Sequence, residues 1–124
     1  MSSKRILIVD DNEYILALLE AFFQRSAPHC QTVTTNKAST ALSELLLQSF
    51  DLLLSDYHMP EMNGLELAQH ARHLTPEIKI VLMTSDCSCE LRDKVRTLDL
   101  NGFIAKPFTM RQLKQTFQQT GILV

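Results

Sequence analysis

The chain has 124 residues, of which 45% are hydrophobic and 21% charged, and its formal net charge is −2. This composition is typical of one folded domain, and no run of like charges indicates a nucleic acid or a membrane surface as a partner. No apolar stretch reaches the roughly 18 residues that a membrane span needs, and no signal peptide opens the chain. We therefore expect a single cytoplasmic domain over residues 1–124, long enough to bury a sizeable core.

Three cysteines, Cys30, Cys87 and Cys89, form an odd set without the spacing of a disulfide framework. Such a set favours a reducing compartment. The pair Cys87-x-Cys89 is compatible with a metal or redox site, but without further ligands small side chains at a helix start are the favoured interpretation.

The first half of the chain predicts two strand–helix units. An apolar strand over residues 5–9 precedes a helix over 12–26 that ends before Pro28. A β-branched strand over 31–34 precedes a helix that Asn36 is expected to cap. Helical spacing predicts that these residues face the core: Ile15, Leu18, Leu19 and Phe22 in the first helix, and Ala38, Ala41, Leu42, Leu45 and Leu46 in the second.

The second half continues the alternation. The apolar run 52–54 has the pattern of a central strand buried on both faces, and a helix is expected over 65–74. A strand over 78–83, a helix near 90–98 and a short strand after Asn101-Gly102 follow. Thr109 is expected to cap a last helix, with Met110, Leu113 and Phe117 facing inward. Five alternations of strand and helix predict a doubly wound α/β fold.

Chemically active side chains follow four of the predicted strands: Asp10-Asp11, Asp56, Thr84 and Lys106. In a parallel sheet the carboxyl ends of the strands meet at one edge, where ligands bind. Three carboxylates near one another favour a hard cation such as Mg²⁺, and a carboxylate oxygen beside it can act as a nucleophile toward phosphorus. Lys106 and Thr84 would then contact the phosphoryl oxygens. Taken singly, the aspartates have a structural alternative as helix caps or turn formers.

Together these residues resemble the receiver domain of bacterial two-component response regulators, the CheY-like family. The resemblance covers essentially the whole chain and is carried by Asp10-Asp11, Asp56-Tyr57-His58-Met59-Pro60-x-Met62-x-Gly64, Thr84 and Lys106-Pro107-Phe108. It implies a flavodoxin-like parallel sheet of five strands in the order 2-1-3-4-5, with five flanking helices. The implied function is regulatory and not enzymatic, apart from self-catalysed phosphorylation and dephosphorylation.

The resemblance also implies roles for single residues. Asp56 would accept a phosphoryl group from a histidine kinase or a histidine phosphotransfer protein. Asp11 and Asp56 would ligate Mg²⁺, with Asp10 acting directly or through water and the backbone carbonyl of His58 adding an oxygen. Thr84 and Lys106 would hold the phosphoryl group, and the Lys106–Pro107 bond would be cis.

A conformational switch is implied as well. Thr84 would move toward the phosphoryl group and Phe103 into the vacated space, which would alter the surface of the fourth helix, fifth strand and last helix. A downstream output protein or a fused output domain would bind that surface, and a phosphorylation-dependent dimer stays open. Ser85 departs from the small residue usual in the family, and His58 and Asp86 occupy variable positions that tune hydrolysis of the phosphoryl group.

Other functions remain alternatives at this point. An aspartyl-phosphate phosphatase would have a second acid two residues after the nucleophile, where this chain has His58. A vestigial interaction module would not bind magnesium. A nucleotide-binding domain is disfavoured because the chain has neither a GxGxxG motif nor a P-loop. His70 and His73, three residues apart, are expected to be exposed polar residues because no third metal ligand is evident.

Overall fold

The computed structural model describes residues 3–85 and 89–123, and it contains a five-stranded, all-parallel sheet. The strand order is β2-β1-β3-β4-β5, which confirms the predicted order. The strands are β1 (Arg5–Val9), β2 (Gln31–Thr35), β3 (Leu52–Asp56), β4 (Lys79–Thr84) and β5 (Gly102–Ala105). All five lie within two residues of the bounds expected from the sequence.

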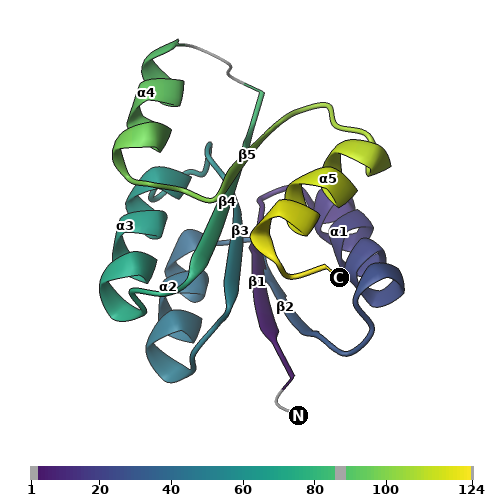
Figure 1. Cartoon of the computed structure of the whole chain (residues 1–124). Coiled ribbons are helices and arrows are strands. Elements are labelled where there is room, and N and C mark those ends of the chain that lie inside the picture. The colour runs from purple at the N-terminus through teal and green to yellow at the C-terminus, as the bar shows by residue number, and fades with distance from the viewer. Residues whose placement is uncertain (1–2, 86–88, 124) are drawn as a thin grey trace.

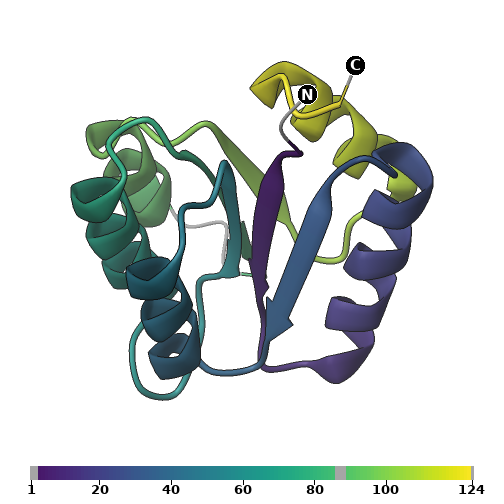
Figure 2. The ribbon, with the colours of Figure 1, turned by 90° about the horizontal axis from the view of Figure 1, so that it is seen from below.

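Helices cover both faces of the sheet, as Figures 1 and 2 show. The first and last helices lie on one face, and the other three lie on the opposite face. They are α1 (Glu13–Ser26), α2 (Ala38–Leu47), α3 (Gly64–Leu74), α4 (Cys89–Thr97) and α5 (Met110–Thr120). After β2 the chain crosses to the other face of the sheet. The next strand, β3, pairs with β1 on the side away from β2. Because strand–helix–strand connections keep the same handedness, this reversal of direction places α2, α3 and α4 on the face opposite α1.

The sheet separates two apolar clusters because neighbouring residues of a strand point to opposite faces. Ile6 and Ile8 of β1 pack with α1 and α5, where the rings of Phe22, Phe23 and Phe117 meet with centroids 4.9–6.0 Å apart. Leu7 and Val9 pack with α2 and α3 on the other side. Every residue of β3 is buried, as expected for the central strand.

Three residues predicted to face the core are exposed instead. Leu18, Leu46 and Met110 are 37%, 66% and 49% accessible, whereas Leu16 and Phe23 are buried. Both α1 and α2 carry more apolar residues than one stripe can hold, so spacing alone does not fix how each helix is rotated against the sheet. The remaining predicted core positions of α5, Leu113 and Phe117, are fully buried.

Helix capping also differs from expectation at one place. Asn36 does not cap α2; its side-chain amide donates to Oε1 of Glu13 at 2.8 Å, and Lys37 occupies the N-cap without a side-chain bond. Asn12 and Asn63 cap α1 and α3 through their side-chain oxygens. Thr109 caps α5 in a reciprocal capping box with Gln112, as predicted. Among the described helices none is long and apolar enough to cross a membrane.

Candidate functional site

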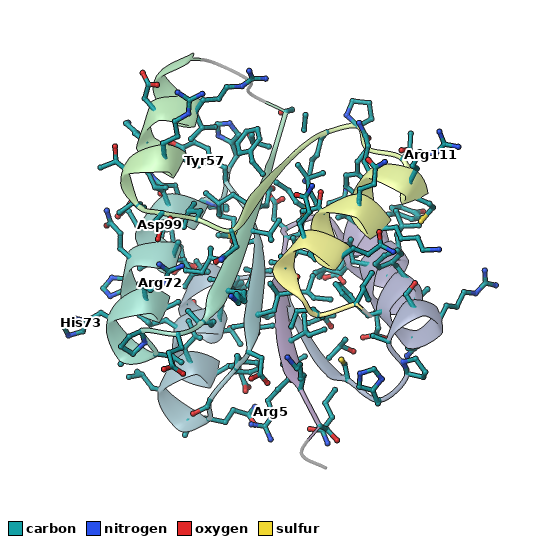
Figure 3. The ribbon with its side chains drawn as sticks, in the orientation of Figure 1. Arg5, Tyr57, Arg72, His73, Asp99 and Arg111 are labelled. Atoms are coloured by element: carbon teal, nitrogen blue, oxygen red, sulfur yellow. The ribbon has the colours of Figure 1, made fainter. Side chains whose placement is uncertain are left out.

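The carboxyl ends of the strands meet at one edge of the sheet, the upper edge in Figure 1. Asp10 directly follows β1, Asp56 and Thr84 are the last residues of β3 and β4, and Lys106 directly follows β5. Tyr57, labelled in Figure 3, lies at the same edge, immediately after the strand that ends at Asp56. The fold therefore brings these residues together from four strand ends, as the topology requires.

Lys106 joins two of the carboxylates. Its Nζ lies 2.7 Å from Oδ2 of Asp10 and 3.4 Å from Oδ1 of Asp56. In the part of the chain that the structure describes, these are the only ion pairs within 4.0 Å. The side chain of Asp10 is completely buried, so a cation at this distance is needed to offset the loss of its hydration.

The three aspartates form a compact group. One carboxylate oxygen from each of Asp10, Asp11 and Asp56 lies within 4.8 Å of the others, and Asp11 is the exposed member. An all-oxygen donor set of this size with one solvent-facing side fits a hard divalent cation that keeps several water ligands. Beside the group, a cavity of about 290 Å³ opens between Asp11 and the loop after β3, where His58, Met59, Pro60 and Asn63 line it.

The charges of the site shift the protonation of two groups. Burial raises the pKa of Asp56 above its usual value, and the neighbouring carboxylates of Asp10 and Asp11 act in the same direction, while Lys106 opposes them. Burial alone would lower the pKa of Lys106, but its bonds to Asp10 and Asp56 outweigh burial and raise it. The cluster thus holds more negative charge than one ammonium neutralises.

The backbone around the site is fixed by hydrogen bonds between neighbouring strand ends. The amide of Lys106 donates to the carbonyl of Thr84 at 2.8 Å, and the amide of Tyr57 donates to that of Met83 at 2.8 Å. Oδ1 of Asp10 accepts from the amide of Asn12 at 2.9 Å. Asp10 is therefore held by a cation on one oxygen and by the start of α1 on the other.

Gly64, the first residue of α3, approaches the chain at Asp56 very closely. Its amide donates to the carbonyl of Tyr57 at 2.8 Å. A Cβ at this position would lie 2.3 Å from the carbonyl oxygen of Asp56 and 3.0 Å from the Cα of Tyr57. Only glycine fits this contact, which returns the loop after β3 to the sheet. In the sequence Gly64 is visible only as part of a motif, because its close contact with Asp56 depends on the path of the loop after β3.

The remaining predicted residues have different positions. Thr84 is fully buried at the end of β4, and Phe103 on β5 is half-buried. His58 is exposed, with its ring edge-on to that of Tyr57 at a centroid distance of 4.8 Å. His70 and His73 are exposed as expected, and Figure 3 shows His73 pointing away from the molecule. The expectations for Asp86 and for the pair Cys87 and Cys89 fall on residues or side chains outside those described.

The raised pKa of Asp56 predicts a pH-dependent gain in stability for Asp56→Asn without divalent cations. The folded chain disfavours the ionised carboxyl, so Asp56 costs stability above its raised pKa, and the cost disappears as the pH falls toward 3.8. We expect the variant to be more stable than the unmodified chain at pH 7, with the difference shrinking at low pH or when Mg²⁺ is added. Urea unfolding between pH 4 and pH 8 measures this.

A matched control for this prediction is Asp99→Asn. Asp99 is exposed and precedes the amino end of β5, whereas the three aspartates of the site lie at the carboxyl ends of the strands. Asp99 has a φ of 53°, a conformation that asparagine tolerates well. The control is expected to show no pH-dependent gain. An Asp56→Asn variant less stable than the unmodified chain at pH 7 would contradict the raised pKa.

Comparison with known proteins identifies the class. The family model described as "Response regulator receiver domain" matches residues 6–118, so the chain belongs to the receiver domain family of two-component systems. Members of this family are regulatory phosphoacceptor domains and not conventional enzymes, and they bind Mg²⁺ at an acidic pocket.

Individual relatives agree with this assignment. The response regulator receiver protein CpdR of Brucella abortus is 34% identical over 110 residues, which are 89% of this chain and 90% of that protein. Chemotaxis response regulator CheY4 of Vibrio cholerae superposes with a TM-score of 0.85 at 25% identity, covering 96% of this chain and 99% of that one. TrrA of Thermotoga maritima, solved in complex with Mg²⁺-BeF, superposes with a TM-score of 0.81 at 28% identity, covering 94% of this chain and 98% of that one.

Other relatives are much longer than this chain. The chain spans 15% of the CAI-1 autoinducer sensor kinase/phosphatase CqsS of Vibrio cholerae and 12% of the sensor histidine kinase RcsC of Salmonella typhi. In these relatives the matching region is therefore one part of a larger kinase.

Proposed function

We propose that Asp56 accepts a phosphoryl group from a phosphohistidine of a kinase or phosphotransfer protein, with Mg²⁺ bound beside it. The observation that carries this proposal is the position of Lys106, whose Nζ lies within 3.4 Å of Oδ1 of Asp56 while three carboxylates converge within 4.8 Å. We further propose that residues 1–124 form one receiver domain and that it works in a reducing cytoplasm. The Mg²⁺-BeF complex of TrrA supports the metal, because that similar receiver was solved with it.

Asp56 is the best nucleophile among the three aspartates. Asp10 is fully buried and both of its oxygens are engaged, one by Lys106 at 2.7 Å and the other by the amide of Asn12 at 2.9 Å. Asp11 is exposed and has no ion pair among those found in the described chain. Asp56 combines burial with a looser contact to Lys106, so an oxygen can turn toward phosphorus while the ammonium stays nearby.

The chemistry follows from this arrangement. An oxygen of Asp56 forms a bond to phosphorus as the bond from phosphorus to the donor's imidazole nitrogen breaks, and the electron pair leaves with the imidazole. Mg²⁺ supplies charge neutralisation, and Asp10, Asp11 and Asp56, with the backbone carbonyl of His58, are the groups we propose to hold it. Lys106 and the hydroxyl of Thr84 stabilise the phosphoryl oxygens.

Phosphorylation is proposed to change the surface made by α4, β5 and α5. Thr84 moves toward the phosphoryl group and the ring of Phe103, which lacks a phenol hydroxyl, repacks into the vacated space. Because the two states differ by these new contacts, phosphorylation shifts the population between them. An output protein, a fused output domain or a second phosphorylated copy is the proposed reader of that surface.

The proposal predicts phosphorylation at one residue. Incubating the chain with Mg²⁺ and acetyl phosphate is expected to add the mass of one phosphoryl group, and EDTA is expected to prevent the addition. Asp56→Asn is expected to abolish the gain, while Asp99→Asn keeps it. Intact-mass spectrometry measures the result.

Two outcomes would contradict this assignment. A phosphoryl gain that survives in Asp56→Asn would assign the acceptor elsewhere. Steady turnover of phosphate monoesters would favour the aspartyl-phosphate phosphatase. A chain that binds no magnesium at all would favour the vestigial interaction module.

A further inference from the structure

A polar cavity lies at the edge of the sheet opposite the aspartate cluster. It has a volume of about 490 Å³ and opens between the end of α3, the start of β4 and the turn that precedes β5. This volume is within the range of pockets that hold small ligands. Its charged and amide-bearing lining residues are Arg72, Glu77, Lys79, Asp99 and Asn101. Figure 3 shows Arg72 of α3 beside Asp99.

Arg72 is the loosely held member of this lining. Its Nη1 and Nη2 donate to the carbonyl of Asp99 at 3.4 and 3.5 Å, and Nη2 also reaches Oδ1 of Asn101 at 3.4 Å. Bonds from a guanidinium to a well-placed anionic oxygen are usually about 2.7–2.9 Å long, so these contacts are weak. Oδ1 of Asn101 also accepts from the amide of Ile80 at 2.8 Å. The guanidinium therefore has no close acceptor of its own.

The Nε of Arg72 gives a second indication that an acceptor is needed. It is buried and has no hydrogen-bond partner. A buried N–H without an acceptor costs free energy, and native proteins rarely leave one unsatisfied. In the described part of the chain no ion pair within 4.0 Å involves Arg72, although Glu77 and Asp99 line the same cavity. Because its present contacts are long, the side chain can turn Nε and one Nη toward the cavity with little loss.

The charges of the lining select the kind of acceptor. Nε and one Nη of an arginine form a planar fork that matches two oxygens of a carboxylate or a phosphate. Lys79 adds a second positive charge to the cavity, whereas Glu77 and Asp99 add two negative charges. The two acids repel a dianion such as phosphate more strongly than a singly charged group. A carboxylate with one negative charge therefore fits this lining best.

We propose that this cavity is a second ligand site, in which Arg72 binds the carboxylate of a small organic acid or of an acidic side chain on a partner protein. The inference goes beyond the proposed phosphorylation of Asp56, because none of the three clustered aspartates lines the cavity. Binding there involves no covalent step and requires neither Mg²⁺ nor a phosphodonor.

The test is a titration of the ¹⁵N-labelled chain with sodium acetate at constant ionic strength, followed by the NMR shifts of the backbone amides of Lys79 and Asn101. Arg72→Gln is expected to raise the dissociation constant by about tenfold or more, because it removes the charged fork. Arg72→Lys keeps the charge without the fork and is expected to give an intermediate constant. Glu77→Gln is expected to lower the constant, because it removes a repelling charge. Arg111→Gln, at an exposed arginine that does not line the cavity, is the matched control and keeps the original constant.

A second titration distinguishes the two sources of the carboxylate. It uses a tripeptide with capped ends and one central glutamate, whose only charge is the side-chain carboxylate. Tighter binding of acetate that depends on Arg72 would assign the cavity to small organic acids. Tighter binding of the tripeptide that depends on Arg72 would assign it to an acidic side chain of a partner.

The outcomes also separate this inference from the proposed function. Equal dissociation constants in Arg72→Gln and Arg111→Gln would show that Arg72 does not bind the carboxylate, and the inference would be wrong. Tighter binding of inorganic phosphate than of either carboxylate would overturn it as well. Neither result bears on phosphorylation of Asp56, and a chain that no phosphodonor labels could still bind acetate at Arg72.

Discussion

Replacing Gly64 with alanine is expected to destabilise the fold by about 3 kcal/mol or more, since the added methyl group collides with backbone and not with a movable side chain. The new Cβ would lie 2.3 Å from the carbonyl oxygen of Asp56 and 3.0 Å from its carbonyl carbon. For a domain of this size the loss corresponds to a fall in melting temperature of roughly 10 °C. Thermal and urea unfolding measure it directly.

The same change is expected to reduce phosphorylation of the molecules that remain folded. Relief of the collision moves the segment around Asp56 or the start of α3, and both hold the proposed acceptor in place. Displacement of a reacting group by about 1 Å can cost a factor of about 100 in rate. The rate with acetyl phosphate, divided by the folded fraction, measures this part of the effect.

Gly121→Ala is the matched control for Gly64→Ala. Gly121 has a φ of 82°, but a Cβ there would meet nothing within 4 Å. The expected cost is about 1 kcal/mol, from the left-handed backbone alone, with no change in phosphorylation. Equal losses for the two variants would show that the contact with Asp56 has no special weight.

The sequence predicted the strands better than the burial of the helices. In β3 the continuous apolar run predicts a strand covered on both faces, and this requires no knowledge of which helix lies above it. Leu18, Leu46 and Met110 were assigned to the core wrongly, because the rotation of a helix depends on the sheet residues beneath it. The prediction that Asn36 caps α2 is wrong because its side chain bonds Glu13 instead, and a bond to a residue 23 positions away leaves no pattern in the local sequence.

The candidate site was predictable as a set and not in its contacts. Parallel topology places Asp10, Asp56 and Lys106 at one edge whatever the side-chain conformations are. Asp10 is buried and its neighbour Asp11 is exposed. This difference depends on how the segment after β1 enters α1, where the amide of Asn12 donates to Oδ1 of Asp10. The collision at Gly64 likewise needs the three-dimensional path of the loop after β3.

Replacing Lys106 with methionine is expected to slow phosphorylation by about 100-fold, the usual cost of removing one donor that stabilises developing charge. Methionine keeps most of the side chain's length but removes the ammonium that lies 2.7 Å from Asp10 and 3.4 Å from Asp56. The rate constant with saturating Mg²⁺ and acetyl phosphate measures the loss.

Without Mg²⁺ the same Lys106→Met change is expected to lower the free energy of unfolding by about 2–4 kcal/mol at pH 7, because it leaves the fully buried carboxylate of Asp10 without its cation. Adding Asp10→Asn is expected to recover most of that loss, since the second change removes the unpaired charge. Lys79→Met, the same chemical change at an exposed lysine at the opposite end of β4, is expected to alter neither quantity.

Equal effects at Lys79 and Lys106, or no recovery in the double variant, would mean that Lys106 does not neutralise the acidic cluster. Recovery of stability in the double variant, beside a 100-fold loss of rate in Lys106→Met alone, would separate the two roles of Lys106: the charge balance of the folded chain and the stabilisation of the phosphoryl group during transfer.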